Sequence, residues 1–239
     1  MTTPRLTVCF DNYPGEPGLR TLWGFAAVLD LPGQKILFDT GSNGRILLEN
    51  MDRLGQRPED LDMLFLSHPH WDHIGGLDSV LELNPRLQVV VHEGFSKHLL
   101  RDLEEMCAQL TVIGRDMTPL APGVHSTGLF DSDPPEHALV LDTGDVTALI
   151  TGCAHPGIDT LVRAAAQRLG RPVRWAIGGF HLMYSDEAKI QQTLVALRDL
   201  GVTDVVPTHC TGDAARAAFQ EAYGPHCHDG GVGQVIEIA

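Results

Sequence analysis

Short apolar runs bounded by turn residues recur along the chain. Runs of this length that are rich in β-branched residues predict buried strands. They cover residues 6–10, 22–31, 35–38, 63–67 and 87–92, and then residues 138–142, 146–151, 173–179, 204–209 and 232–238. Pro32 and Gly33 predict a hairpin turn between the second and third runs. No element is predicted between residues 93 and 137.

Apolar residues at helical spacing separate many of these runs. Ile46, Leu47, Met51 and Leu54 predict a helix over residues 44–54. Further helices are predicted over residues 77–83, 158–169, 186–200 and 213–223. Strands that lead into alternating strands and helices predict an α/β domain with sheets inside and helices outside. Because no repeat or long linker divides the chain, we expect one domain over residues 1–239.

Composition and charge narrow the classes of partner. A net charge of -14 argues against non-specific binding to nucleic acid or to an anionic membrane. No apolar run approaches the roughly 18 residues that span a bilayer. The start, MTTPRLTVCF, lacks the pattern of a secretory signal, and the five cysteines form no CxxC pair. These features favour a reduced, cytoplasmic protein and leave its oligomeric state undecided.

Histidines follow the ends of four predicted strands. They are His68, His70 and His73 after MLFLS, His155 after ALITGCA, His181 after WAIGGF and His209 after DVVPT. Open α/β sheets place their ligands at the carboxyl ends of strands, so histidines from four strands can converge there. A lone histidine at a strand end is more often a hydrogen-bonded polar residue than a ligand. The repetition of this setting favours a metal site.

The stretch LSHPHWDHIGG (66–76) has its own geometry. Pro69 disfavours a helix and favours an extended conformation for His68. In an extended chain His68, His70 and Asp72 share one face, and His73 points away. A short turn then offers one pair of side chains to each of two metal ions. The two glycines that come next allow the backbone to pass close to a neighbour.

The same residues resemble a known family. HPHWDH resembles the His-x-His-x-Asp-His signature of the metallo-β-lactamase superfamily, and ILFDTG (36–41) resembles its upstream aspartate motif. The resemblance implies a four-layer αββα sandwich of two mixed sheets with a dinuclear site. It implies that one ion is bound by His68, His70 and His155, and the other by Asp72, His73 and His209. Asp39 is then expected to orient a ligand histidine, although an aspartate before Thr40 also suits a simple turn.

One position departs from the superfamily pattern. Most hydrolases of the superfamily bridge the two ions with an aspartate, whereas this chain has GGFHL with His181 in that interval. TGCAHPGID, GGFHL and PTHCTG together resemble proteins similar to dihydropterin-methyl-ribofuranosylaminobenzene-phosphate synthase. A neutral His181 leaves the site more positive, so we expect it to favour anions and to hold its second ion less tightly. His181 itself is a terminal ligand, an acid/base, a substrate contact or a buried core residue.

The resemblance implies a hydrolase that uses a metal-bound hydroxide. Two divalent ions, zinc first and iron or manganese as alternatives, acidify bound water to a pKa of about 7. The expected substrate is a small anion such as a phosphoester, with Asp72 and His181 as catalytic residues. Two alternatives stay open at this point. One is a pterin-linked transferase or synthase at the same site, and the other is a metal- or ligand-binding sensor without turnover.

Weaker candidates surround this set. Trp71 and Tyr184 are candidate walls of the substrate pocket, although packing explains them equally well. Thr211 and Gly212 precede a predicted helix whose free N–H groups suit a phosphate, or they form an ordinary helix cap. Cys153 and Cys210 lie beside expected ligands; they are soft ligands, redox-sensitive thiols or, most commonly for such residues, small buried side chains.

Overall fold

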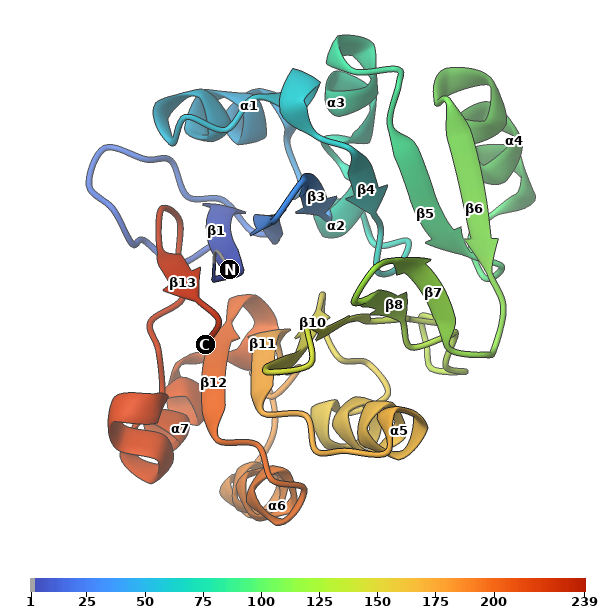
Figure 1. Ribbon diagram of the computed structural model, residues 1–239. Coiled ribbons are helices and arrows are strands. Elements are labelled where there is room, and N and C mark those ends of the chain that lie inside the picture. The colour runs from blue at the N-terminus through green and yellow to red at the C-terminus, as the bar shows by residue number, and fades with distance from the viewer. Residues whose placement is uncertain (1–2) are drawn as a thin grey trace. The chain divides into compact units, whose positions relative to one another are not determined.

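The computed structural model describes residues 3–239, which form two compact units. Unit 1 comprises the chain up to Gly114 together with Gly231–Ala239, and unit 2 comprises Arg115–Gly230. Each unit contains one sheet with helices packed against it (Figure 1).

The sheet of unit 1 has seven strands in the order β13-β1-β2-β3-β4-β5-β6. Their bounds are β1 (Arg5–Phe10), β2 (Ala26–Leu31), β3 (Gln34–Phe38), β4 (Met63–Phe65), β5 (Gln88–His92), β6 (Gln109–Ile113) and β13 (Val235–Glu237). Pairing is antiparallel from β13 to β3 and parallel from β3 to β6. The carboxyl ends of β3, β4 and β5 therefore point the same way.

Three of the helices of unit 1 bury apolar side chains in its core. They are α1 (Gly44–Arg53), α2 (Trp71–Ile74), α3 (Leu77–Leu83) and α4 (Lys97–Met106), with a 3₁₀ turn η1 (Pro58–Asp60). Leu47 of α1, Val80 of α3 and Leu103 of α4 are fully buried in one cluster with Leu37 and Val89 from the strands. The helical spacing of apolar residues in the sequence matches the faces that these helices bury.

The sheet of unit 2 has six strands in the order β12-β11-β10-β9-β8-β7. Their bounds are β7 (Thr118–Ala121), β8 (Val124–Ser126), β9 (Leu139–Asp142), β10 (Thr147–Thr151), β11 (Trp175–Gly179) and β12 (Asp204–Thr208). Pairing is antiparallel from β7 to β10 and parallel from β10 to β12. The loops after β10, β11 and β12 consequently emerge at one edge of this sheet.

The helices of unit 2 cover its sheet (Figure 1). They are α5 (Ile158–Leu169), α6 (Glu187–Asp199) and α7 (Asp213–Tyr223), with 3₁₀ turns η2 (His209–Thr211) and η3 (Gly224–His226). Leu161, Leu194 and Phe219, one from each helix, share a buried cluster with Val140 and Val205 of the sheet. Gly170 ends α5 in the left-handed conformation that the sequence predicts for a helix C-terminus.

The predicted elements agree with the structure where the apolar pattern is strong. The helices predicted over 158–169 and 213–223 have those bounds, and the two mixed sheets confirm the α/β class. The strand predicted over 22–31 was too long, because only Ala26–Leu31 is strand. The prediction missed α4 and the strands β6, β7 and β8. Within residues 3–239, no helix is long and apolar enough to cross a membrane.

Candidate metal centre

Strained backbone marks the loops that carry the candidate ligands. Among the described residues, four that are not glycine have a positive φ: Asp39, Ala154, His181 and His209, at 56°, 56°, 52° and 49°. The left-handed region is unfavourable for residues with a Cβ, and such strain concentrates at functional sites. Each of the four lies just after one of the strands β3, β10, β11 and β12. No pattern in the sequence indicates this strain.

In unit 1 the FDTG turn is bonded directly to the histidine loop. Thr40 donates its N–H and its hydroxyl to the carbonyl oxygen of His73, at 2.7 and 2.9 Å. Gly75 donates its N–H to the carbonyl of Gly41 at 2.8 Å, and Gly76 donates to the Thr40 hydroxyl. The two motifs, which lie about thirty positions apart in the sequence, thus form one rigid substructure of unit 1.

The two glycines are required by close approach, as predicted from the sequence. A Cβ on Gly75 would lie 2.5 Å from the carbonyl oxygen of Ser42. A Cβ on Gly76 would lie 2.5 Å from the carbonyl oxygen of Thr40. Contacts this short are not tolerated, so only glycine lets the histidine loop pack on the FDTG turn.

Asp39 is fully buried and accepts three hydrogen bonds. Its Oδ1 accepts from the N–H of Ser67 at 2.7 Å, and its Oδ2 accepts from the Ser67 hydroxyl at 2.7 Å. The same Oδ2 lies 2.7 Å from Nδ1 of His73. With a carboxylate as acceptor, Nδ1 carries the proton and Nε2 keeps its lone pair, the form that binds a metal. The hydrogen bond from His73 to Asp39 holds the ring of this candidate ligand in one orientation, and the role of Asp39 beside a metal ion stays a prediction.

The histidine rings of this loop pack against one another, edge-on or tilted. The ring centroid of His68 lies 4.9 Å from that of His70 and 4.2 Å from that of His73. Nε2 of His73 lies 3.8 Å from Oδ2 of Asp72. In a fully extended chain His73 would point away from His68, but the chain stops being extended after His70 and forms α2, at the place where a short turn was expected. That single turn brings all four donor side chains of the loop together.

In unit 2 a buried carboxylate holds the loop of His155. Glu136 is fully buried; its Oε1 accepts from Thr151 Oγ1, Cys153 N and Ala154 N at 2.8–3.0 Å. Its Oε2 accepts from His155 N at 2.7 Å. Burial raises the pKa of Glu136, and the four donors oppose that rise. This residue was not predicted from the sequence; its only signal is an acidic side chain shortly before the apolar run of residues 138–142.

Three histidines and two cysteines lie close together in the same unit. Sulfur and nitrogen atoms of Cys153, His209 and Cys210 lie within 4.8 Å of one another, and so do those of Cys153, His155 and His181. Burial opposes ionisation of Cys210, but hydrogen bonds with Cys153 and His181 lower its pKa well below the ordinary value. The hydrogen bond with Cys210 in turn raises the pKa of His181. The exposed His181 ring also lies 4.4 Å from that of His155.

A pocket of about 260 Å³ lies beside these histidines within unit 2. His155, His181 and Phe180 line it on one side, with Gly157 at the start of α5. Lys189, Ser185 and Asp159 line it as well, so a cation, a hydroxyl and a carboxylate face the same space. The pocket accordingly carries one positive and one negative side chain next to the two histidines within unit 2.

The four weaker candidates for the substrate pocket differ in how far they are buried. Trp71 is 62% exposed and Tyr184 is 94% exposed, so neither side chain is packed in a core. Thr211 is buried and its hydroxyl accepts from the N–H of Phe180 at 3.0 Å. Gly212 precedes α7 with φ 80°, and a Cβ there would lie 2.5 Å from Met183. Thr211 and Gly212 therefore hold the loop after β11 against the start of α7.

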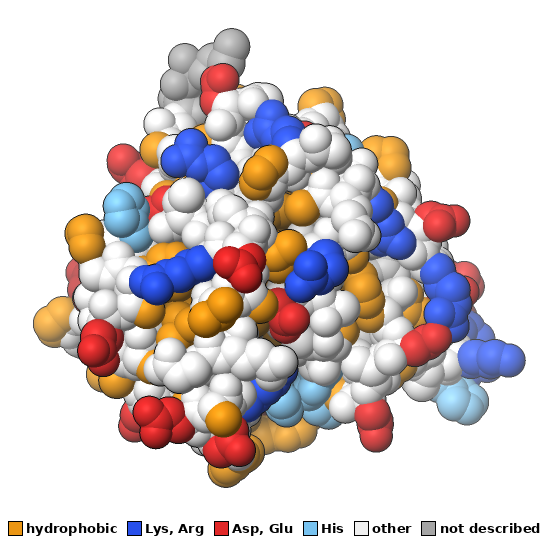
Figure 2. All heavy atoms as spheres, turned by 90° about the horizontal axis from the view of Figure 1, so that it is seen from below, with side chains coloured by type: hydrophobic (Ala, Val, Ile, Leu, Met, Phe, Trp, Pro, Cys, Tyr) orange, Lys and Arg blue, Asp and Glu red, His pale blue; other side chains and the backbone are white. Residues whose placement is uncertain are grey.

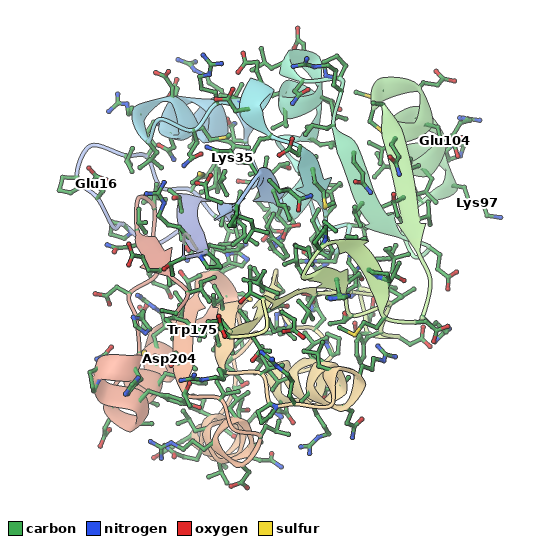
Figure 3. The ribbon with its side chains drawn as sticks, in the orientation of Figure 1. Glu16, Lys35, Lys97, Glu104, Trp175 and Asp204 are labelled. Atoms are coloured by element: carbon green, nitrogen blue, oxygen red, sulfur yellow. The ribbon has the colours of Figure 1, made fainter. Side chains whose placement is uncertain are left out.

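A separate cluster lies at the other ends of β11 and β12. Asp204 accepts from Nδ1 of His226 at 2.9 Å and lies 3.1 Å from Nε2 of His228. The His228 ring stacks on Trp175, which is paired in register with Asp204, and Figure 3 labels both residues at the strand starts. Burial opposes ionisation of Asp204, but the hydrogen bonds with both histidines lower its pKa. This cluster ties the chain before Gly230 to the sheet of unit 2.

The charged side chains are mixed on the surface. On the face that Figure 2 shows, Lys and Arg side chains are interspersed with Asp and Glu. The described residues of that face form no continuous basic strip of the kind that follows a nucleic-acid backbone.

Comparison with known proteins shows similarity to the metallo-beta-lactamase superfamily. The family model for the metallo-beta-lactamase superfamily matches residues 24–209. A 7,8-dihydropterin-6-methyl-4-(beta-D-ribofuranosyl)-aminobenzene-5'-phosphate synthase of Methanocaldococcus jannaschii is 29% identical over 235 residues, covering 80% of each chain. The crystal structure of Tm1679, a metal-dependent hydrolase of the beta-lactamase superfamily, is 26% identical with a TM-score of 0.80 over 99% of each chain. A diphosphatase from the PhnP family shares the fold alone, with a TM-score of 0.64 at 15% identity over 99% of this chain and 98% of its own.

Proposed function

This chain belongs to the metallo-β-lactamase superfamily, and from that premise we propose that it is a metal-dependent hydrolase of a small anionic substrate such as a phosphoester. The observation that carries the proposal is the hydrogen bond from buried His73 to buried Asp39, inside a loop that holds four donor side chains. A histidine fixed in this way by a carboxylate is typical of metal ligands. The 26% identity with a metal-dependent hydrolase over the whole chain supports the same reaction class.

The donor set fits two divalent ions. Imidazole nitrogens and one carboxylate suit zinc, and they also suit iron and manganese. We assign His68, His70 and His155 to one ion and Asp72, His73 and His209 to the other, on the family pattern. When bound, such ions would lower the pKa of a water molecule, which supplies the nucleophile, and would polarise the phosphoryl group whose phosphorus accepts the attack.

The chain's own residues then have separable tasks. Asp39 keeps the His73 ring in one orientation and one tautomer. Glu136 fixes the backbone of the loop that carries His155 through four hydrogen bonds. The exposed His181 lines the pocket with Lys189, so it is placed to exchange a proton with a group bound there. Lys189 attracts an anionic group bound there, and Asp159, which lines the same pocket, opposes that attraction.

We also propose a reducing compartment such as the cytoplasm. All five cysteines, at positions 9, 107, 153, 210 and 227, are free thiols in the structure. Secreted proteins more commonly pair such residues in disulfides.

A second candidate is a pterin-linked synthase. The 29% identity with the synthase of Methanocaldococcus jannaschii over 80% of each chain favours it. The two candidates share the metal ligands and differ in what the pocket accepts. Binding of a reduced pterin without hydrolysis of any ester would favour the synthase.

The test is hydrolysis of chromogenic phosphomonoesters and phosphodiesters by protein reconstituted with zinc. We expect turnover that is lost in His70→Ala and retained in His125→Ala, a matched change in unit 2 outside the candidate ligands. Absence of turnover with every ester, in protein that binds zinc, would count against the hydrolase.

A further inference from the structure

We propose that this chain forms a two-fold symmetric dimer with a second copy of itself, through strand β6 and the neighbouring helix α4 of unit 1 (Figure 1). Among the described strands β6 pairs only with β5, so one side of β6 is an open edge of the sheet. An open edge is a template for pairing with another strand. The dimer goes beyond the proposed function and does not depend on a metal ion.

Strand β6 lacks the residues that usually prevent such pairing. Proteins block an open edge with proline or with charged side chains. Of the four edge strands of the described sheets, β13 contains Glu237, β12 contains Pro207 and β7 contains Pro119. Strand β6 has the sequence QLTVI, with neither a proline nor a charged residue. The chain thus protects three edges against another strand and leaves the fourth unprotected.

The backbone of β6 directs hydrogen-bonding groups out of the sheet at two residues. Ile113 accepts from the N–H of Glu93 at 3.0 Å, so the backbone groups of Ile113 face β5. Because successive residues of a strand face opposite neighbours, the N–H and C=O groups of Leu110 and Val112 point away from β5.

These groups are self-complementary under two-fold symmetry. In an antiparallel pair centred on Thr111, Leu110 of one copy lies opposite Val112 of the other, and the two residues exchange both of their backbone hydrogen bonds. Symmetry repeats the same pair on the other side of the centre. The outward backbone groups of both residues are then satisfied in each copy.

The same register covers exposed apolar side chains. Leu110 and Val112 are two positions apart and project from one face of the sheet, where Leu110 packs against the buried cluster that includes Leu103 of α4. Val112 is 45% exposed, and Met106 at the end of α4 is 38% exposed. In the dimer each Val112 side chain lies against Leu110 of the other copy, and apolar cross-strand pairs of this kind stabilise a sheet.

The charges on α4 complement those of a second, antiparallel α4. The first half of the helix carries Lys97 and Arg101, and the second half carries Asp102, Glu104 and Glu105. Lys97 and Glu104 are exposed and seven positions apart, so they lie on one side of the helix (Figure 3). A two-fold axis through the paired β6 strands, perpendicular to the sheet, places both α4 helices on the same face and runs them antiparallel. Lys97 of each copy then lies opposite Glu104 of the other.

The first test is the association state of the full chain, measured by sedimentation velocity at micromolar concentrations. We expect a reversible dimer. Val112→Lys places an ammonium group against Leu110 of the other copy and should raise the dissociation constant by about tenfold or more. Val195→Lys is the matched control, because Val195 is an exposed valine of α6 in unit 2, and its association should equal that of the wild type. A monomeric wild type, or an equally tight dimer in Val112→Lys, overturns the proposal.

Charge reversal on α4 tests the symmetry and leaves β6 unchanged. Lys97→Glu and Glu104→Lys each bring like charges together at both symmetric contacts, so each should weaken the dimer by about five- to tenfold. The double variant Lys97→Glu/Glu104→Lys restores opposite charges and should associate like the wild type. Single variants without effect, or a double variant weaker than either single one, contradict the antiparallel helices. Metal-free and zinc-loaded chains should dimerise equally, so the result is independent of whether the chain hydrolyses esters.

Discussion

Oδ2 of Asp39 lies 2.7 Å from Nδ1 of His73, and both side chains are fully buried. The bond fixes which nitrogen of His73 is free for a metal ion. Asp39→Asn is nearly isosteric but places either a weaker acceptor or an N–H donor against Nδ1. We expect the affinity of the ion bound through His73 to fall about 10–100-fold. Competition with a chromophoric zinc chelator measures this change.

The control for this change is Asp78→Asn, which removes the same charge from an exposed position in α3. Its zinc affinity should equal that of the wild type. If Asp39→Asn also binds zinc like the wild type, the hydrogen bond serves only the packing of unit 1.

Glu136 provides a test of how the His155 loop is held. In Glu136→Gln an amide N–H₂ replaces one of the two carboxylate oxygens. A buried backbone N–H that now donates to that oxygen loses its acceptor. We expect the free energy of unfolding to fall by about 1–3 kcal/mol. Urea denaturation followed by circular dichroism measures it. Glu221→Gln, on the exposed side of α7, should change it by less than about 0.5 kcal/mol; equal effects of the two variants would refute the role of Glu136.

Asp204 makes a pH-dependent contribution to stability. Its pKa in the folded chain is lowered by hydrogen bonds with His226 and His228, so the unfolded chain takes up the proton first as the pH falls. The stabilisation by ionised Asp204 is therefore complete above the ordinary pKa of an aspartate, about 3.9. It is lost as the pH falls through the lower pKa that Asp204 has in the folded chain. Asp204→Asn should be less stable than the wild type near neutral pH, with the difference shrinking toward pH 3.

Urea midpoints between pH 3 and pH 7 show this trend. Asp145→Asn, in the exposed turn before β10, is the control and should follow the wild type at every pH. A constant difference between Asp204→Asn and the wild type across the range would mean that the hydrogen bonds, but not the charge, stabilise the fold.

Gly179 is predicted to tolerate no side chain. In Gly179→Ala the new Cβ would lie 2.5 Å from the carbonyl oxygen of Gly152 and 2.6 Å from Cys210 Sγ. Overpacking of this kind costs about 1–3 kcal/mol, and relief would move Cys210 away from His209. We expect a lower thermal midpoint together with weaker zinc binding, since the new Cβ would also lie 3.3 Å from the His209 ring. Gly114→Ala, where a Cβ meets nothing within 4 Å, should change neither.

The sequence predicted the fold class and the ligand loops better than their geometry. Strand-end histidines were identifiable because apolar runs and glycines flank them on the printed sequence, and the helices with strong apolar spacing have their predicted bounds. A short turn was expected after the extended stretch, but its helical form was not, because Pro69 favours an extended conformation only for the residue before it. Tertiary hydrogen bonds from Thr40 to the carbonyl of His73 hold the helical turn. No local sequence pattern predicts these bonds.

The positions of Glu136, Cys153 and Cys210 could not be predicted from the sequence for a different reason. A buried glutamate has no local pattern, since its partners are backbone N–H groups at positions 153–155 that only the fold brings to it. Cys153 and Cys210 lie 57 positions apart, so their proximity depends on the parallel pairing of β10, β11 and β12. Both depend on topology, which one sequence does not specify by itself.

The central claim is that the histidines after the strands hold metal ions. The most direct test is the metal content of tag-free protein, by mass spectrometry, after dialysis against zinc and removal of unbound ions. We expect about two zinc ions per chain, falling to about one in His70→Ala. A folded chain that retains no metal after this reconstitution would contradict the account.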